Sequence, residues 1–293
     1  MNKWIEFAKQ VFKESQKDDI LGQSAQLSFY LLLGLFPALL CLTALVGMLP
    51  LEEVFQQLMD YLHTVLPANS LGLVQNYLQQ VEAGSGTGIF SFGMFGALWA
   101  ASSGALALMS ALNVVYEVGE SRSFWKARLV AVGITIGLGF FIMVSIFLIM
   151  LGGRVSQWIA EWIGFGDLFV VLWAMIQWPL IIIFMFIAVN STYYFAPNRR
   201  SSWMKNSPGA MVAVVLWLVV SLGFKVYVEN FNNYNAAYGS LAAGVVLMLW
   251  LYISGLALLL GAEINCELSK RASPVLEPNA RTGYAERSAK YLH

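Results

Sequence analysis

The sequence predicts an all-α protein that crosses a membrane six times and carries two short amphipathic helices in its first outer loop. Three observations predict this fold. The 293 residues are 58% hydrophobic and only 12% charged, with a mean hydropathy of +0.66, whereas soluble domains carry about 25% charged residues. Six apolar stretches without Asp, Glu, Lys or Arg are long enough to cross about 30 Å of hydrocarbon as helices. Finally, basic residues are concentrated in every second segment between the apolar stretches.

Each apolar stretch is apolar on every side, which is typical of membrane helices, because the strands of a membrane barrel alternate apolar with polar residues. The six spans are expected at residues 24–49, 89–113, 129–153, 168–195, 207–224 and 238–262. Residues 1–19 form a cytoplasmic amphipathic segment before the six-helix domain of residues 20–271. Residues 272–293 are polar and interrupted by proline, which predicts a flexible tail.

The first outer loop, residues 50–87, has its own helical periodicity. Val54, Leu58 and Val65 recur at helical spacing, with acidic residues on the opposite side. After Pro67, either Asn69 or Ser70 is a suitable cap for a second amphipathic segment. Two short helices lying over the outer face are therefore expected.

The distribution of Lys and Arg predicts the orientation. With the N-terminus in the cytoplasm, fifteen of the seventeen basic residues fall in cytoplasmic segments and only Arg154 and Lys225 fall outside. Cytoplasmic loops are enriched in basic residues. The count therefore predicts an even number of spans with both termini in the cytoplasm.

Composition also excludes several classes of function. Seventeen basic and seventeen acidic residues give no net charge, so the chain has no overall field that would attract nucleic acid. The cysteines are Cys41 and Cys266, and the histidines are His63 and His293, which provide neither a disulfide framework nor a clustered metal site. Phosphate-binding loops and nucleophile elbows are absent. We expect no enzyme, no cofactor, no metal and no nucleic-acid partner.

Polar residues within spans are informative because burying them in lipid is costly unless they have partners. Gln23, Gln26 and Tyr30 open the first span before Pro37, which removes a backbone hydrogen bond. They either line a polar entry beside a bent helix or cap and connect helices. Gln177 in the fourth span is either a helix contact or a substrate ligand.

A second polar group lies between the fifth and sixth spans. Lys225 and Glu229 are four residues apart and can pair on one helix face. With Asn233 and Tyr238 they form either an outer turn or an outer gate that contacts head groups.

Glu263 and Asn265 end the sixth span on the side that carries Lys126, Arg128, Arg199 and Arg200. Glu263 is expected either to pair with one of these cations and hold a gate shut, or to anchor the helix at the interface. Small residues elsewhere predict close helix packing. They are Gly133 and Gly137 in the third span, and Ala100, Ser102, Ser103, Gly104 and Ala107 in the second.

Several motifs resemble a known family. LSFYLLLGLFPALL in the first span, YYFAPNRR after the fourth, and YGSLAAGVVLMLWLY and GAEIN in the sixth look like the YihY/BrkB family of bacterial inner-membrane proteins. The resemblance covers residues 23–267 and implies a six-span inner-membrane protein with both termini inside. Members have carried the label ribonuclease BN, and others are associated with serum resistance and with movement of lipid A precursors. The resemblance supplies no catalytic residues.

The favoured function is transport or translocation of a lipid or another amphiphile of the envelope. Membrane lipids are the expected partners, with an anionic lipid or amphiphile as substrate, because Arg128 and its neighbours would suit a phosphate head group. The alternative is a membrane scaffold that organises envelope proteins or its own homo-oligomer. The nuclease function fits the residues poorly, since neither metal ligands nor a phosphate-binding cation cluster is recognisable.

Overall fold

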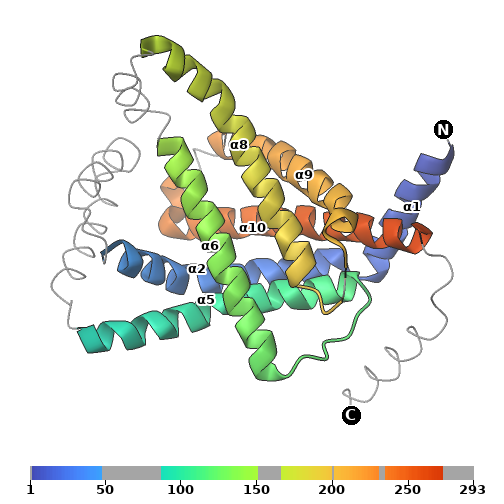
Figure 1. Ribbon diagram of the computed structural model, residues 1–293, viewed down its shortest axis with the longest axis horizontal. Helices are drawn as coiled ribbons and strands as arrows, with labels where there is room; N and C mark the ends of the chain where they lie inside the picture. Colours follow the sequence, from blue (N-terminus) through green and yellow to red (C-terminus); the bar gives the residue numbers. More distant parts are fainter. Residues whose placement is uncertain (1, 48–86, 151–165, 200, 231–234, 273–293) are drawn as a thin grey trace. The chain divides into compact units, whose positions relative to one another are not determined.

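The computed structural model describes residues 2–47, 87–150, 166–199, 201–230 and 235–272, which form helices and short connections with no strand among them. Figure 1 shows how the helices follow one another along the chain. The helices are α1 (Asn2–Lys17), α2 (Ile20–Gly47), α5 (Thr87–Val115), α6 (Phe124–Met150), α8 (Gly166–Phe195), α9 (Trp203–Asn230) and α10 (Asn235–Ala272).

Five of the described helices, α5, α6, α8, α9 and α10, are long and apolar enough to cross a membrane. Helix α2 adds a shorter apolar stretch over Ile20–Leu35. The prediction of an all-α polytopic membrane protein is confirmed in this coarser form. The sixth span is not established. The predicted loop helices of residues 50–87 and the tail from residue 273 onward lie outside the described residues.

The chain divides into two compact units, one of Met1–Leu32 with Gly104–His293 and the other of Leu33–Ser103. In the larger unit α9 packs along α10, α8 packs against α9, α6 against α8, and α1 against α10 (Figure 1). In the smaller unit a Cβ at Gly34 would lie 3.2 Å from the carbonyl oxygen of Ala101, so α2 and α5 approach closely there.

Glycines bring the backbones of α9 and α10 together. A Cβ at Gly209 would overlap the carbonyl oxygen of Gly261 and the side chain of Asn265. At Gly261 it would lie 2.5 Å from the carbonyl oxygen of Gly209 and 2.6 Å from the hydroxyl of Tyr193. Real side chains do not tolerate such distances, so both positions require glycine.

The same crossing is held by an asparagine side chain. The amide N–H of Gly209 donates to Oδ1 of Asn265 at 2.7 Å, and Nδ2 of Asn265 donates to the carbonyl oxygen of Asn206 at 2.8 Å. Asn206 and Asn265 are fully buried. A buried amide that satisfies two backbone groups fixes the position of α10 against α9.

Two connections, residues 116–123 and 196–199, are bound to each other. Glu117 follows α5 with φ 50°, and the N–H of Val118 donates to the carbonyl oxygen of Asn113, which is the pattern of a helix C-cap. The backbone N–H of Asn198 donates to Oδ1 of Asn113 at 2.7 Å, and Arg122 donates to the carbonyl oxygen of Pro197 at 2.6 Å. We call this region, with α1 and the last turns of α10, the basal end.

Candidate functional site

A groove of about 400 Å³ lies between α6 and α8, a size typical of small-molecule sites, which span roughly 300–1,000 Å³. Gly133 and Gly137 lie in its wall, and no atom lies within 4 Å of where their Cβ atoms would be. The prediction that these glycines pack tightly against a helix is therefore wrong for the described residues. The lining residues are Val130, Gly133, Ile134, Gly137, Leu138, Phe141, Ala188, Ser191, Thr192 and Phe195.

The lining of this groove is apolar. Its hydroxyl groups are turned to their own helix, because Ser191 donates to the carbonyl oxygen of Ile187 at 2.6 Å and Thr192 to that of Ala188 at 2.9 Å. None of the lining residues is ionisable. The groove therefore suits an acyl chain or an apolar helix.

Two cationic residues precede the groove along α6. Val130 and Phe195 are the lining residues nearest to the basal end along α6 and α8. Arg128 precedes Val130 by two residues and is only 6% exposed, and Lys126 nearby is exposed. An apolar groove that begins just after two cationic residues of α6 offers separate surroundings for a tail and for an anionic head group.

A polar network joins α8, α9 and the end of α5. Oδ1 of Asn206 accepts hydrogen bonds from Ser201 at 2.9 Å and from Arg199 at 3.1 Å, and the guanidinium of Arg199 lies 3.5 Å from the ring centroid of Tyr116. Burial raises the pKa of Tyr116 to about 12, although Arg199 acts in the opposite direction. The phenol therefore stays neutral while Arg199 stacks on its ring.

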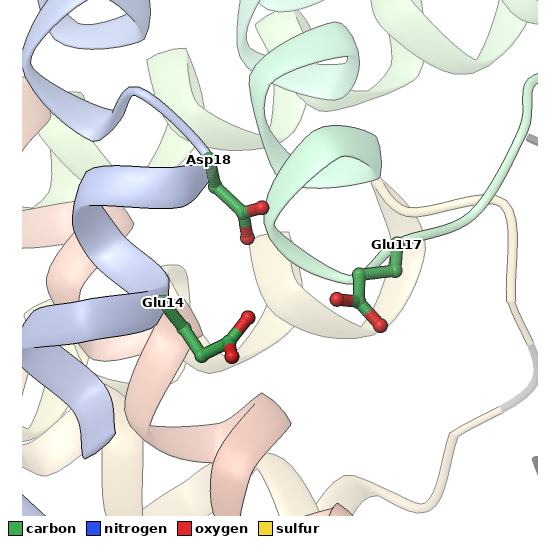
Figure 2. Close-up of side chains that lie close together, drawn as sticks. All are labelled: Glu14, Asp18 and Glu117. Carbon is green, nitrogen blue, oxygen red and sulfur yellow. The ribbon is translucent and has the colours of Figure 1, made fainter. Parts of the chain in front are cut away.

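Three carboxylates meet at the basal end (Figure 2). Glu14 of α1, Asp18 just after it and Glu117 after α5 each place a carboxylate oxygen within 4.8 Å of the others. Lys17 lies between two of them, with Nζ 2.8 Å from Glu14 and 3.1 Å from Glu117. Burial raises the pKa of Asp18 to about 6, and the charges of Glu117 and Glu14 act in the same direction.

Helix α10 adds two further acids and a lysine to this region. Nζ of Lys270 lies 2.8 Å from Glu267 and 3.6 Å from Glu117. Glu263 and Glu267 are fully buried. Both carboxylate oxygens of Glu263 and Oε2 of Glu267 have no hydrogen-bond partner among the described residues.

None of the described arginines pairs with Glu263. Arg199 contacts Asn206 and Tyr116 instead, and no described group bonds to the Glu263 carboxylate. Arg200 lies outside the described residues. The alternative, an anchor exposed at the interface, also fails because Glu263 is fully buried.

The other predicted site residues are not brought together. On α2, Gln23 is half-buried, whereas Gln26 and Tyr30 are exposed and Pro37 lies within the helix. Gln177 is buried in α8, and Lys225 lies in α9. Asn233 and the side chains of Glu229 and Tyr238 lie outside the described residues.

Sequence analysis overlooked the acidic cluster. Glu14 and Asp18 are four residues apart on an amphipathic segment, and Glu117 is the first charge after an apolar stretch. These spacings are a weak signal, because only the fold shows that the segments meet.

Comparisons with known proteins agree on one family. The sequence model described as Virulence factor BrkB matches residues 11–284. YfkH of Bacillus subtilis, whose name describes it as ribonuclease-like, is 36% identical over 267 residues, covering 91% of this chain and 96% of that protein. A UPF0761 membrane protein of Aeromonas salmonicida is 27% identical, covering 92% of this chain and 91% of its own.

Another UPF0761 membrane protein, RSc1559 of Ralstonia nicotianae, is 26% identical over 94% of this chain, which spans only 60% of that relative's length. No solved structure matches the chain.

Proposed function

Because the chain belongs to the family described as Virulence factor BrkB, with relatives named as membrane proteins, we propose that it moves a lipid or another anionic amphiphile across the membrane. The membership confirms the resemblance indicated by the motifs of the first and last spans. The observation that carries the proposal is the apolar groove between α6 and α8, whose first lining residue on α6, Val130, follows Lys126 and Arg128.

In this proposal the groove and the cation serve different parts of one molecule. An acyl chain lies against the apolar walls of α6 and α8. Because these walls are as apolar as lipid tails, the chain enters the groove without leaving an apolar environment. The head group meets Arg128, whose planar guanidinium suits a phosphate, and the exposed Lys126. Movement of the head group past the basal end, while the tail stays in hydrocarbon, is the translocation step.

We place the protein in a bacterial inner membrane with both termini in the cytoplasm. The clustering of basic residues at the basal end supports this orientation. The basal end contains the four lysines of α1 with Arg122, Arg199, Lys270 and Arg271, and Lys126, Arg128 and Lys205 lie in the adjoining first turns of α6 and α9.

The test is lipid movement in liposomes that contain the purified protein and a fluorescent anionic lipid. With the native protein, an impermeant quencher should reach more than the half of the label that lies in the outer leaflet. Gly137→Leu fills the groove and should abolish the excess, and Arg128→Gln should reduce it. Gly139→Leu is the matched control, because Gly139 is on the same helix, has open space around its Cβ position and does not line the groove.

If the Gly137→Leu and Gly139→Leu variants moved lipid equally well, the groove would have no part in transport. No movement above that of empty liposomes, with several head groups, would contradict transport itself.

A scaffold function is the second candidate, and the open glycines of α6 favour it. Small residues in an i, i+4 pair let a partner helix approach closely in lipid, and nothing described covers Gly133 and Gly137. In this alternative a helix of a second copy fills the groove. Gly137→Cys should then form a cross-linked dimer in membranes, in a background lacking Cys41 and Cys266, whereas Gly139→Cys should not.

We propose no nuclease activity, although the Bacillus relative's name describes it as ribonuclease-like. RNA cleavage that copurifies with the native protein and is lost in Glu117→Gln would overturn this.

A further inference from the structure

The acidic cluster of Figure 2 has an arrangement that suits a metal ion. Glu14, Asp18 and Glu117 come from two separate parts of the sequence, and one oxygen of each lies within 4.8 Å of the others. We propose that these three carboxylates bind a divalent cation of the hard, oxygen-preferring class: Ca²⁺, Mg²⁺ or Mn²⁺. The site is independent of the proposed transport.

The spacing of the oxygens is compatible with a shared ion. Ca²⁺ binds oxygen at about 2.3–2.6 Å, so two ligands on opposite sides of it lie about 5 Å apart. The three carboxylates already lie within that limit. They are half-buried, so water can complete the coordination from the open side. Carboxylate oxygen is the preferred ligand of hard cations.

The buried acids of α10 are the independent observation that points to a cation. Glu263 is fully buried and neither of its oxygens has a described partner. It lies one turn before Glu267 on α10. Glu267 has one oxygen without a partner, and its other oxygen shares Lys270 with Glu117.

Charge counting leads to the same conclusion. The ammonium groups of Lys17 and Lys270 bridge three carboxylates, those of Glu14, Glu117 and Glu267, and Asp18 adds a fourth carboxylate beside them. Carboxylates buried without enough positive charge are strongly disfavoured. A divalent ion supplies the missing charge.

Lys17 occupies the place of the cation when none is bound. Its Nζ bridges Glu14 and Glu117, yet its side chain is 54% exposed. The lysine can therefore swing into solvent when an ion enters. The ion and the ammonium compete for the same oxygens, so removal of the ammonium should strengthen ion binding. A residue with a merely structural role would not have this effect.

The experiment is a Mn²⁺ titration of the purified full-length protein in detergent, stripped of metal with a chelator and followed by the EPR signal of free Mn²⁺. The native protein should show one saturable site. Asp18→Asn and Glu117→Gln should each weaken binding about tenfold or more, because affinity follows the number of charged ligands. Lys17→Gln should tighten it severalfold.

Glu6→Gln is the matched control, because Glu6 is an exposed acid of α1 away from the cluster. This variant should bind Mn²⁺ with the same affinity as the native protein. Thermal unfolding of each variant without metal verifies that it is folded, and Ca²⁺ and Mg²⁺ are then tested by competition. The proposal is overturned if the native protein shows no saturable Mn²⁺ binding up to the millimolar range of the weakest protein sites. Unchanged affinity in both Asp18→Asn and Glu117→Gln would also overturn it. Liposome transport plays no part in either outcome.

Discussion

Two helix pairs of the larger unit use glycine in opposite ways. At the crossing of α9 and α10, a Cβ on Gly209 or Gly261 would collide with the facing backbone. At the groove between α6 and α8, Gly133 and Gly137 face open space. The residue type is the same, but at the first pair it permits contact and at the second it leaves room.

The difference shows that glycine permits close approach without causing it. At the crossing, Asn265 bonds both Gly209 and Asn206, so polar contacts pull the backbones together. The hydroxyls in the groove bond to their own helix, so nothing polar links α6 to α8 there. In lipid, apolar surfaces gain little free energy from contact with each other. Polar contacts of this kind therefore determine which glycine-containing helix faces pack together.

The largest expected effect comes from filling the crossing. Gly261→Val would place side-chain atoms against Gly209, Tyr193 and Ala213, the last at 2.7 Å from the new Cβ. Overpacking costs about 1–3 kcal/mol even where side chains can adjust, and here two of the obstacles are a backbone and a buried ring. We expect a loss of more than about 3 kcal/mol or failure to fold, measured by thermal unfolding in detergent.

Gly223→Val is the control for this change, because Gly223 lies on α9 with no atom near its Cβ position. It should unfold close to the native temperature. If Gly261→Val unfolded there as well, the crossing would be far looser than described.

The next effect tests the polar contacts of the crossing. Asn265→Leu keeps the volume but leaves the N–H of Gly209 and the carbonyl of Asn206 without their partner. An unsatisfied buried group costs about 1–3 kcal/mol. Thermal unfolding should reveal a loss in this range, whereas Gln26→Leu, an amide exposed on α2, should change little. Equal effects of the two substitutions would show that the amide of Asn265 does not hold the helices together.

Sequence analysis located the helices better than their contacts. The expected span of residues 168–195 agrees with α8 (Gly166–Phe195), and that of 207–224 lies inside the longer α9 (Trp203–Asn230). Apolar length reports the part of a helix that lipid surrounds, whereas the helix itself continues until its backbone is capped. Helices therefore extend beyond the predicted spans.

The site was predicted only in part for a related reason. Glu263 and Asn265 were recognised as polar residues at the end of a span, but their surroundings depend on which helices cross there. One of the arginines expected to pair with Glu263, Arg199, is held by Asn206 and Tyr116 instead. Hydropathy and charge give the depth of a residue in the membrane and do not give its neighbours.

A smaller effect is expected from a Ser→Ala substitution, which can be made at both helix pairs and compared. Ser254 of α10 accepts a hydrogen bond from the indole N–H of Trp217 of α9 at 3.0 Å, whereas Ser191 bonds only to its own helix. Ser254→Ala should lower stability by about 1 kcal/mol, the net contribution of a typical hydrogen bond. Ser191→Ala should change stability by less than about 0.5 kcal/mol. Thermal unfolding measures both, and the reverse order would contradict the distinction between the two pairs.

The smallest effect, with the opposite sign, is expected in the groove. Gly137→Ala places a methyl group where no atom lies within 4 Å, so nothing opposes the gain in helix propensity, up to about 1 kcal/mol. The variant should unfold at or slightly above the native temperature, whereas Gly261→Ala, with atoms 2.5 Å from its new Cβ, should unfold below it. Destabilisation by Gly137→Ala would mean that a helix or a second copy already fills the groove in the detergent-solubilised protein. Stabilisation together with retained lipid movement would favour a groove that is kept open for a ligand, because one methyl group narrows it without closing it.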